Sequence, residues 1–498
     1  MLLKQLMRRK PLDGMAANID PAHALKRTLG PVDLTALGVG AIIGAGIFSS
    51  VGTAAAGAGG HPAAGPALIV SFLVTAVACG FAALCYAELA AMIPISGSAY
   101  TYAYVTLGEL VAWIIGWDLI LEYAVGNIAV AVSWGDYFNS FLAGFGVHLP
   151  TWMSTTIDRA HKHPEILANA PHLFGIPLVF NLPAFGIVAA LTVLLVVGVK
   201  ESARVNSFIV LLKIVLVLGF IGVGAFYVMP ANWHPFAPNG VTGILSGASL
   251  IFFSYIGFDA VSTTAEEAKN PQRDLPIGMI VSLVLCTVLY IGVTVVLTGM
   301  VHFDKLAVGD PLAVALQTAG LQKLAGVLSF GAVIAMTAVL LVFQLGQPRI
   351  FMSMARDGLL PPFAAKVHPK FRTPHVTTII TGVFVGGFAM FVDINEAIEF
   401  TNIGTLFAFM LVSLGVIVLR YKEPERHRPF RCPGVPVVPA LSAIGCGVLM
   451  AYLPGKTWMR FFVWLVVGFA IYFLYGMKRS HLNRAANKSA LAAESPPA

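Results

Sequence analysis

The chain has 498 residues, of which 57% are hydrophobic and only 11% charged, and its mean hydropathy is +0.82. Soluble domains are about 45–50% apolar and about 25% charged, so the composition excludes a water-soluble enzyme, a secreted disulfide scaffold and a disordered regulator. The net charge of +7 does not require a nucleic-acid partner, because basic residues on the cytoplasmic side of a membrane protein produce the same balance. The composition therefore predicts a polytopic membrane protein whose main partner is the lipid bilayer.

Twelve apolar segments follow one another along the chain, each long enough to cross a hydrocarbon layer of about 30 Å. Because the apolar runs are about 20 residues long, we expect an all-α protein with twelve transmembrane helices and no β-barrel. The segments are 32–57, 66–91, 100–137, 183–199, 205–228, 242–266, 276–300, 324–347, 375–392, 397–419, 435–453 and 458–477.

These segments divide the chain into five regions. A basic cytoplasmic N-terminal arm covers 1–30, with a short interfacial helix expected at 22–29. The later regions are a first five-span repeat at 31–230, a second, inverted five-span repeat at 240–420, spans 11 and 12 at 435–478, and a cytoplasmic tail at 479–498.

The distribution of Lys and Arg predicts the orientation. If the N-terminus is inside, the inner segments hold 24 of the 31 basic residues and the outer loops hold 6, and the remaining one is Lys213 in span 5. By the positive-inside rule, we expect a multi-pass protein of the plasma or inner membrane with both termini cytoplasmic. The largest outer loop, 138–182, carries four histidines at irregular spacing, and we expect a solvated loop there rather than a metal site.

Two spans contain features that interrupt a helix. Span 1 has four glycines within nine residues, 38–46, and each costs a helix about 1 kcal/mol relative to Ala. Close helix packing through small residues is the alternative explanation. Span 6 places Gly257 beside Asp259 near its middle. Spans five apart run in opposite directions, and interrupted helices at matching positions of inverted halves indicate a substrate site near the bilayer centre.

Broken helices leave backbone groups that need partners inside a membrane. Free amides at the start of a half-helix favour an anion, and free carbonyls favour a cation, so an α-amino acid zwitterion fits both. The amides are those of Gly44, Ala45 and Gly46. The carbonyls are those of Ile42, Phe253 and Ile256.

Three stretches resemble the amino acid–polyamine–cation superfamily, and specifically a bacterial member of the cationic amino acid transporter family. They are GAIIGAGIF at 40–48, FSYIGFDA followed by EEAKNPQRDLP within 253–276, and GQPR followed by MARDGLLP within 346–361. The resemblance covers roughly residues 25–480. It implies a five-plus-five inverted-repeat (LeuT-like) fold with discontinuous spans 1 and 6, and alternating access to a central site.

The resemblance also implies roles for residues. The substrate carboxylate would meet the span 1 amides, its amino group would meet the carbonyls, and the Phe253 ring would act as the gate. A match at 126–129 puts Glu122 and Tyr123 near the pocket wall. The complete set of expected substrate-binding residues is Ile42, Ile43, Gly44, Ala45, Gly46, Phe253, Ser254, Ile256, Asp259, Tyr123 and Phe343.

Three ionisable residues are candidates for proton coupling. Lys213 is the only basic residue deep in a span, and an ionisable group there is costly and is therefore a candidate for function. The resemblance implies that its ammonium replaces the sodium ion of sodium-driven relatives, whereas a static salt bridge or snorkelling is the structural alternative. Asp259 would be a proton relay, an amine contact or a latch, or it would cap the half-helix after Gly257. Glu122 would pair with Lys213 or line the route, or it would be a packing carboxylate.

The function expected from these features is secondary active import of L-amino acids by proton symport. No cofactor and no sodium are expected, and the proton is the coupling ion. Phe343 and Gln344 are expected to face the pocket, and a bulky Phe343 favours small neutral substrates such as alanine. Arginine or lysine transport and obligate exchange are the alternatives.

Other classes of function fit less well. An enzyme is not expected, because HExxH and GxSxG motifs are missing, and a receptor would want a large domain outside the spans. We expect a monomer, and a single-span accessory subunit stays open.

Overall fold

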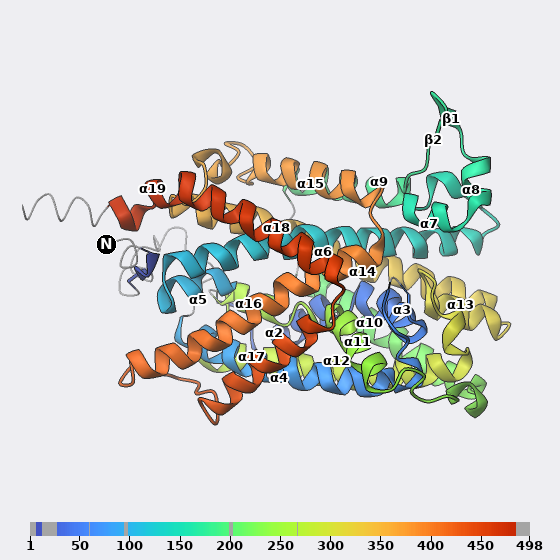
Figure 1. Cartoon of the computed structure of the whole chain (residues 1–498), viewed down its shortest axis with the longest axis horizontal. Coiled ribbons are helices and arrows are strands. Elements are labelled where there is room, and N and C mark those ends of the chain that lie inside the picture. Colours follow the sequence, from blue (N-terminus) through green and yellow to red (C-terminus); the bar gives the residue numbers. More distant parts are fainter. Residues whose placement is uncertain are drawn as a thin grey trace, which may run out of the picture.

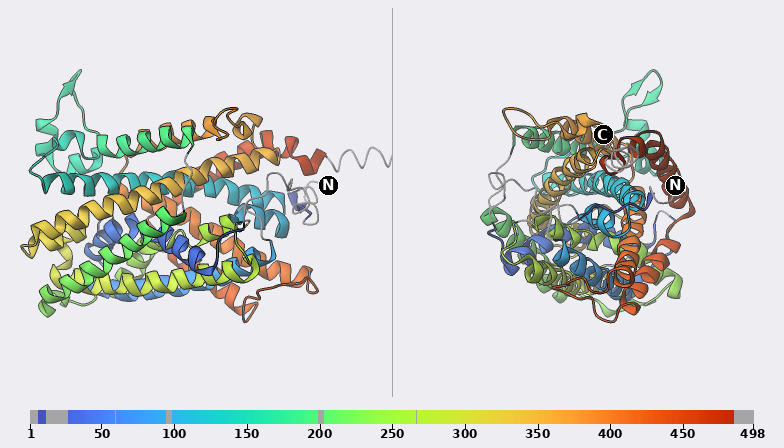
Figure 2. Two further views of the ribbon diagram at one scale, coloured as in Figure 1. Left: turned by 180° about the vertical axis from the view of Figure 1, so that it is seen from behind. Right: turned by 90° about the vertical axis from the view of Figure 1, so that its left-hand side faces the viewer.

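The computed structural model describes residues 6–11, 27–58, 60–93, 98–198, 203–265 and 267–484. The interfacial helix expected at 22–29 lies largely outside the described residues, and so does the tail beyond 484. The described chain is a bundle of long helices that run side by side along one axis (Figure 1). Both described ends of the chain lie at the same end of this bundle, which we call the terminal end (Figure 2).

Eight helical stretches among the described residues are long and apolar enough to cross a membrane, and a ninth is a bent pair at span 1. Three shorter apolar helices occupy the places of predicted spans 4, 9 and 11. The all-α prediction is confirmed, and the count of twelve spans stays a prediction. The eight stretches are Gly65–Met92, Glu109–Ala143, Asn206–Tyr227, Gly240–Thr264, Pro271–Met300, Gln322–Arg356, Ile394–Lys422 and Gly455–Arg479.

The helices of the bundle are bounded as follows. They are α2 (Pro31–Ile42), α3 (Val51–Ala56), α4 (Leu68–Met92), α5 (Ser98–Thr106), α6 (Glu109–Ala143), α9 (Leu182–Val197), α10 (Ala203–Gly224), α11 (Gly240–Ile251), α12 (Pro271–Met300), α13 (Pro311–Thr318), α14 (Gln322–Arg356), α15 (His375–Ala389), α16 (Ile394–Lys422), α17 (Val437–Ala451), α18 (Gly455–Ile471) and α19 (Met477–Arg479).

The third apolar run is two helices rather than one long span. It is interrupted between α5 and α6 at Gly108, whose φ is +115°. A Cβ on Gly108 would lie 2.8 Å from the backbone carbon of Met7. Both the positive φ and the close approach of the N-terminal arm require glycine, and neither was visible in the hydropathy pattern.

Two sets of helices pack mainly among themselves. The first set is α2, α4 and α12, joined by the segments of span 6. The second set is α6, α14 and α16, with α9 and α15 packed along α6. The first set carries the interrupted spans, which therefore lie against a frame made of the second set.

The opposite end of the bundle, which we call the loop end, carries the long connection between α6 and α9. This connection contains α7 (Ile157–Lys162), α8 (Pro164–Asn169) and an antiparallel hairpin of β1 (His172–Leu173) and β2 (Ile176–Pro177). Figure 1 shows the hairpin projecting sideways from the bundle. The four histidines of this connection are exposed, as expected for a solvated loop. Arg159 on α7 also attaches the loop to the bundle, because it donates to both carboxylate oxygens of Asp136 on α6, at 2.8 and 3.2 Å.

Candidate functional site

Span 1 is discontinuous, as predicted. α2 ends at Ile42, a π-helical turn follows at Gly46–Ser50, and the two helical parts are bent by 42°. The last regular bond of α2 runs from the Ile43 amide to the Val39 carbonyl at 2.9 Å. The amides of Gly44 and Ala45 donate to no protein group in the described part of the chain. These two donors are available to a ligand.

The carbonyls freed by this break are satisfied by side chains from other spans. The Lys213 ammonium on α10 donates to the carbonyls of Gly40 at 2.6 Å and Ile43 at 2.9 Å. The Tyr290 hydroxyl on α12 donates to the Ile42 carbonyl at 2.9 Å. A charge-assisted donor at an unpaired carbonyl is a strong interaction in a dry environment. Lys213 and Tyr290 therefore stabilise the broken form of span 1.

Among the residues that it describes, the structure shows neither of the two structural roles considered for Lys213 from the sequence, which were snorkelling to the interface and a static salt bridge. The Lys213 side chain is 0% exposed, which excludes snorkelling to the interface. It forms no salt bridge with any carboxylate among residues 27–58, 60–93, 98–198, 203–265 and 267–484. Glu122 is also buried, but it lies beside Thr405 and within electrostatic range of Asp259 instead of pairing with Lys213.

Span 6 breaks where Gly257 was expected to interrupt it. α11 is followed by two 3-10 segments, Phe252–Tyr255 and Asp259–Thr264, and Gly257 between them has φ +121°. A Cβ on Gly257 would lie 2.9 Å from the carbonyl of Ala41 in span 1. The Asp259 carboxylate accepts a hydrogen bond from the Gly257 amide at 3.3 Å. This bond lies at the break, before the 3-10 segment that starts at Asp259, so the capping role considered for Asp259 stays a prediction.

The two interrupted segments touch each other directly. A Cβ on Gly46 would lie only 2.4 Å from the Cα of Ser254. The Ser50 hydroxyl lies beside this contact. It donates to the Gly46 carbonyl at 2.6 Å, and it lies 3.4 Å from the Ser254 hydroxyl. Phe253, Ser254 and Ile256 are all buried. The structure thus brings together the span 1 and span 6 residues that the sequence singled out.

Two aromatic residues lie next to each other between spans 3 and 8. The rings of Tyr123 and Phe343 are 5.5 Å apart, and a Cβ on Gly126 would lie 3.1 Å from the Phe343 ring. Gln344 does not face this region as expected, because its amide donates to the Thr192 hydroxyl on α9 at 2.6 Å. Its position one residue after Phe343 on a helix turns it by about 100° towards α9.

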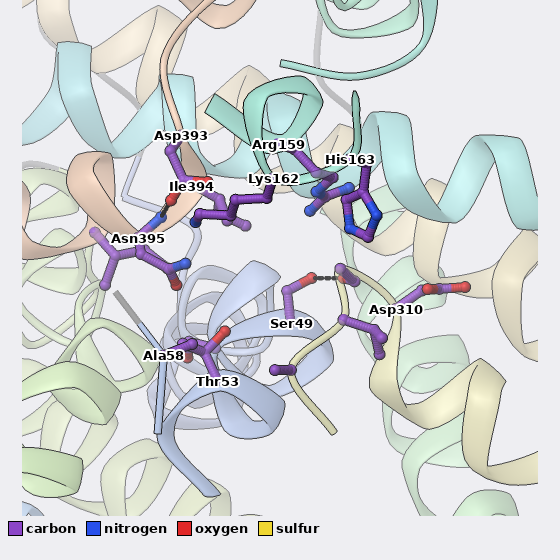
Figure 3. A pocket seen from close by; sticks show the side chains of 15 residues that line it. Ser49, Thr53, Ala58, Arg159, Lys162, His163, Asp310, Asp393, Ile394 and Asn395 are labelled. Atoms are coloured by element: carbon purple, nitrogen blue, oxygen red, sulfur yellow. Dashed lines mark hydrogen bonds between the residues drawn. The ribbon is translucent and has the colours of Figure 1, made fainter. Parts of the chain in front are cut away.

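A cavity of about 350 Å³ at the loop end leads towards the broken segment of span 1 (Figure 3). Its floor includes Ser49, whose hydroxyl donates to the Gly309 carbonyl at 2.7 Å. Burial raises the pKa of Asp310 at its edge to about 7, although a hydrogen bond from Ser140 opposes the shift. The lining residues labelled in the figure are Ser49, Thr53, Ala58, Arg159, Lys162, His163, Asp310, Asp393, Ile394 and Asn395.

The sequence analysis missed a buried polar cluster beside this cavity. His61, in the connection after α3, lies 3.0 Å from the Glu399 carboxylate on α16. The only signal in the sequence was a glutamate within the apolar run of span 10. Its partner is 338 residues away, so no local pattern could have paired them.

We expect Gly46→Ala to destabilise the fold, because the added methyl group would overlap the Ser254 backbone and push spans 1 and 6 apart. The loss should be about 1–3 kcal/mol or more, measured as a lower thermal unfolding temperature of the purified protein in detergent. Gly222→Ala on α10 is the matched control, since nothing lies within 4 Å of its added Cβ. Equal unfolding temperatures for the two variants would contradict the close contact between the breaks.

Comparison with known proteins identifies the family of the chain. The amino acid permease family model matches residues 29–481. The chain is 50% identical to the branched-chain amino acid permease BcaP of Bacillus subtilis (strain 168) over 480 residues, which are 96% of this chain and 99% of that protein. It is 48% identical to the methylthioribose transporter of the same organism over 482 residues, covering 97% and 100%. It is 40% identical to the vacuolar cationic amino acid transporter 4 of Arabidopsis thaliana over 434 residues, covering 85% and 68%.

These relatives are named as permeases and transporters rather than enzymes, and the resemblance to the superfamily is confirmed. The chain belongs to the amino acid permease family of the amino acid–polyamine–cation superfamily and is a multi-pass membrane protein.

Proposed function

We propose that this permease imports neutral L-amino acids together with protons, by alternating access around the contact between spans 1 and 6. The observation that carries the proposal is the buried Lys213 ammonium bound to the carbonyls of the broken span 1 segment. This contact joins an ionisable group to the same backbone segment whose amides are available to a ligand. Binding of a proton and binding of a substrate are therefore coupled through one short stretch of chain.

The pairing of free donors and carbonyls supports an amino acid as substrate. The unbonded amides of Gly44 and Ala45 suit a carboxylate, and the carbonyls of Phe253 and Ile256 suit an ammonium group. Methylthioribose, named for one relative, is an uncharged sugar derivative and would leave the amides without an anion. We therefore assign the carboxylate to span 1 and the amino group to span 6.

The aromatic wall supports a neutral side chain. Tyr123 and Phe343 form an apolar boundary, and the Asp259 carboxylate is engaged by the Gly257 amide. A long cationic side chain would need both space and a free carboxylate there. Small substrates such as alanine are the first choice, and branched-chain amino acids are the second, because a relative of 50% identity is named for them.

The ammonium of Lys213 also explains how a proton could drive the cycle without sodium. A charged ammonium donates strongly to the Gly40 and Ile43 carbonyls. Loss of its proton weakens both bonds and frees the span 1 segment to move. The five-plus-five inverted repeat supplies the moving parts, since the interrupted spans belong to one helix set and α6, α14 and α16 to the other.

The terminal end is assigned to the cytoplasm, because the inner segments carry 24 of the 31 basic residues against 6 in the outer loops. The loop end then faces outward, in the plasma or inner membrane. A monomer contains all the residues named above, and an accessory subunit stays possible.

The first experiment is uptake of labelled alanine, leucine and arginine into proteoliposomes without sodium, with and without an inside-alkaline pH gradient. Accumulation of alanine or leucine that collapses with the gradient supports the proposal. Accumulation of arginine would contradict the neutral pocket. Uptake that needs preloaded amino acid and ignores the gradient would identify an exchanger, and inhibition by methylthioribose alone would contradict an amino acid substrate.

We expect Lys213→Ala to abolish gradient-driven accumulation, because the variant lacks the group that binds the proton beside span 1. Counterflow exchange of substrate across equal pH should persist at a reduced rate. Lys323→Ala at the loop end is the control and should retain accumulation, since Lys323 is exposed. Full gradient-driven accumulation by Lys213→Ala would remove the proton-carrier role.

The size of the pocket has its own test. We expect Phe343→Ala to widen the space opposite Gly126 and to raise the affinity for leucine relative to alanine by about tenfold, the factor for one or two buried methylene groups. The measurement is competition by each unlabelled amino acid against labelled alanine. An unchanged affinity ratio would show that Phe343 does not border the substrate side chain.

A further inference from the structure

A buried polar cluster at the loop end is not used by the transport scheme above. His61 lies 2.8 Å from the Ser246 hydroxyl through Nδ1 and 3.0 Å from the Glu399 carboxylate through Nε2. The second oxygen of Glu399 accepts a hydrogen bond from the Thr457 hydroxyl at 2.6 Å. His61 is 5% exposed and Glu399 4% exposed. A buried histidine in direct contact with a buried carboxylate is a candidate for function.

The cluster joins parts of the chain that belong to different helix sets. His61 follows α3, which is the loop-end half of broken span 1. Ser246 lies on α11, which is the loop-end half of broken span 6. Glu399 lies on α16 and Thr457 on α18. The bond between His61 and Glu399 therefore ties the loop-end halves of both interrupted spans to the frame. These halves must leave the frame for the loop end to open.

The pair borders a second cavity, of about 400 Å³, at the loop end. Glu399 is among its lining residues, so water from that side can reach the carboxylate. Two of the nearby charges form an ion pair, Glu396 with Arg460 at 2.8 Å, and the Asp393 carboxylate accepts a hydrogen bond from the backbone amide of Asn395 at 2.9 Å. The remaining charged groups that line this cavity are Asp158, Lys162 and Lys456.

We propose that His61 and Glu399 form a proton-binding site at the loop end that holds this side of the permease closed. A protonated imidazole donates from both ring nitrogens, so it bonds Ser246 and the Glu399 carboxylate at once. In the closed form the charged imidazole has an anionic partner in a buried site, where the attraction is stronger than in water. When the loop end opens, water replaces that partner.

The closed form therefore binds the proton more tightly than the open form, and by linkage acid favours closure. External acid would then drive closure behind a bound substrate, in the direction of import. The proton at His61 returns to the outside when the gate reopens, so this site adds nothing to the proton count of Lys213. The inference uses the alternating access proposed above, but not proton symport, and it holds equally for an exchanger.

The test measures opening without transport. Thr53→Cys places a reporter thiol in the loop-end cavity (Figure 3), whereas the five native cysteines are buried. The reporter protein is labelled in proteoliposomes by a membrane-impermeant maleimide between pH 5.5 and 8, with no substrate and no gradient. The rate for each added variant is divided by the rate for the reporter protein alone, which cancels the pH dependence of the thiol.

We expect the ratio for His61→Gln to be near one at pH 8 and to rise at least about fivefold at pH 5.5, within the usual range of such couplings. Glu399→Gln keeps the shape of the cluster without its charge and should give the same rise, so the test survives if one variant fails to fold. A flat ratio for a folded variant of either residue would overturn the proposal.

Two controls separate this pair from other titratable groups at the loop end. His163→Gln changes an exposed histidine that lines the same cavity and lies 3.2 Å from Glu165, and its ratio should stay near one. Asp310, whose pKa is raised to about 7 by burial, is the competing group, and Asp310→Asn should also give a flat ratio. An acid-dependent rise in Asp310→Asn with none in His61→Gln would assign the switch to Asp310 instead. If the proposed proton symport were wrong, gradient-driven uptake would be absent, but the labelling ratios would keep the pH dependence expected here.

Discussion

An ammonium group in the middle of an apolar bundle holds the backbone of span 1 in its broken form. Without Lys213 the carbonyls of Gly40 and Ile43 would face hydrocarbon or a void, and each unsatisfied group there costs several kcal/mol. The buried ammonium is also costly, because a charge at that depth is tolerated only with strong acceptors. The hydrogen bonds between the ammonium and the two carbonyls therefore reduce the cost of burying both. The free amides of Gly44 and Ala45, at the candidate substrate site, follow directly after the backbone that this contact holds.

The contact between the two breaks depends in turn on missing side chains. Gly46 against Ser254, and Gly257 against Ala41, bring backbone to backbone at distances that no Cβ would allow. Such contact makes spans 1 and 6 a single mechanical unit across their middle. Under the proposed alternating access, motion of one half-helix would be accompanied by motion of the other, and the frame of α6, α14 and α16 would be the surface past which this unit moves.

At the loop end a polar contact, between His61 and Glu399, joins the unit to the frame in addition to packing. A second polar contact, between Arg159 and Asp136, attaches the connecting loop to the frame. Polar contacts of this kind can be broken and remade without exposing large apolar surfaces, and their strength depends on protonation and hydration. Packed apolar contacts lack that dependence. A gate that responds to its surroundings is therefore better built from such pairs.

Hydropathy and residue spacing determined a large part of this protein. Runs of about 20 apolar residues predict spanning helices because a helix rises 1.5 Å per residue. The glycines at 38–46 and 257 predicted the breaks, and the isolation of Lys213 marked it as a candidate for function. Tertiary structure alone decided what Lys213 contacts, that Gln344 points to α9, that the third run divides at Gly108, and that His61 meets Glu399. The physical reason is range: periodicity and propensity act over a few turns of helix, whereas these contacts join residues far apart in the chain that only the packing of the bundle brings together.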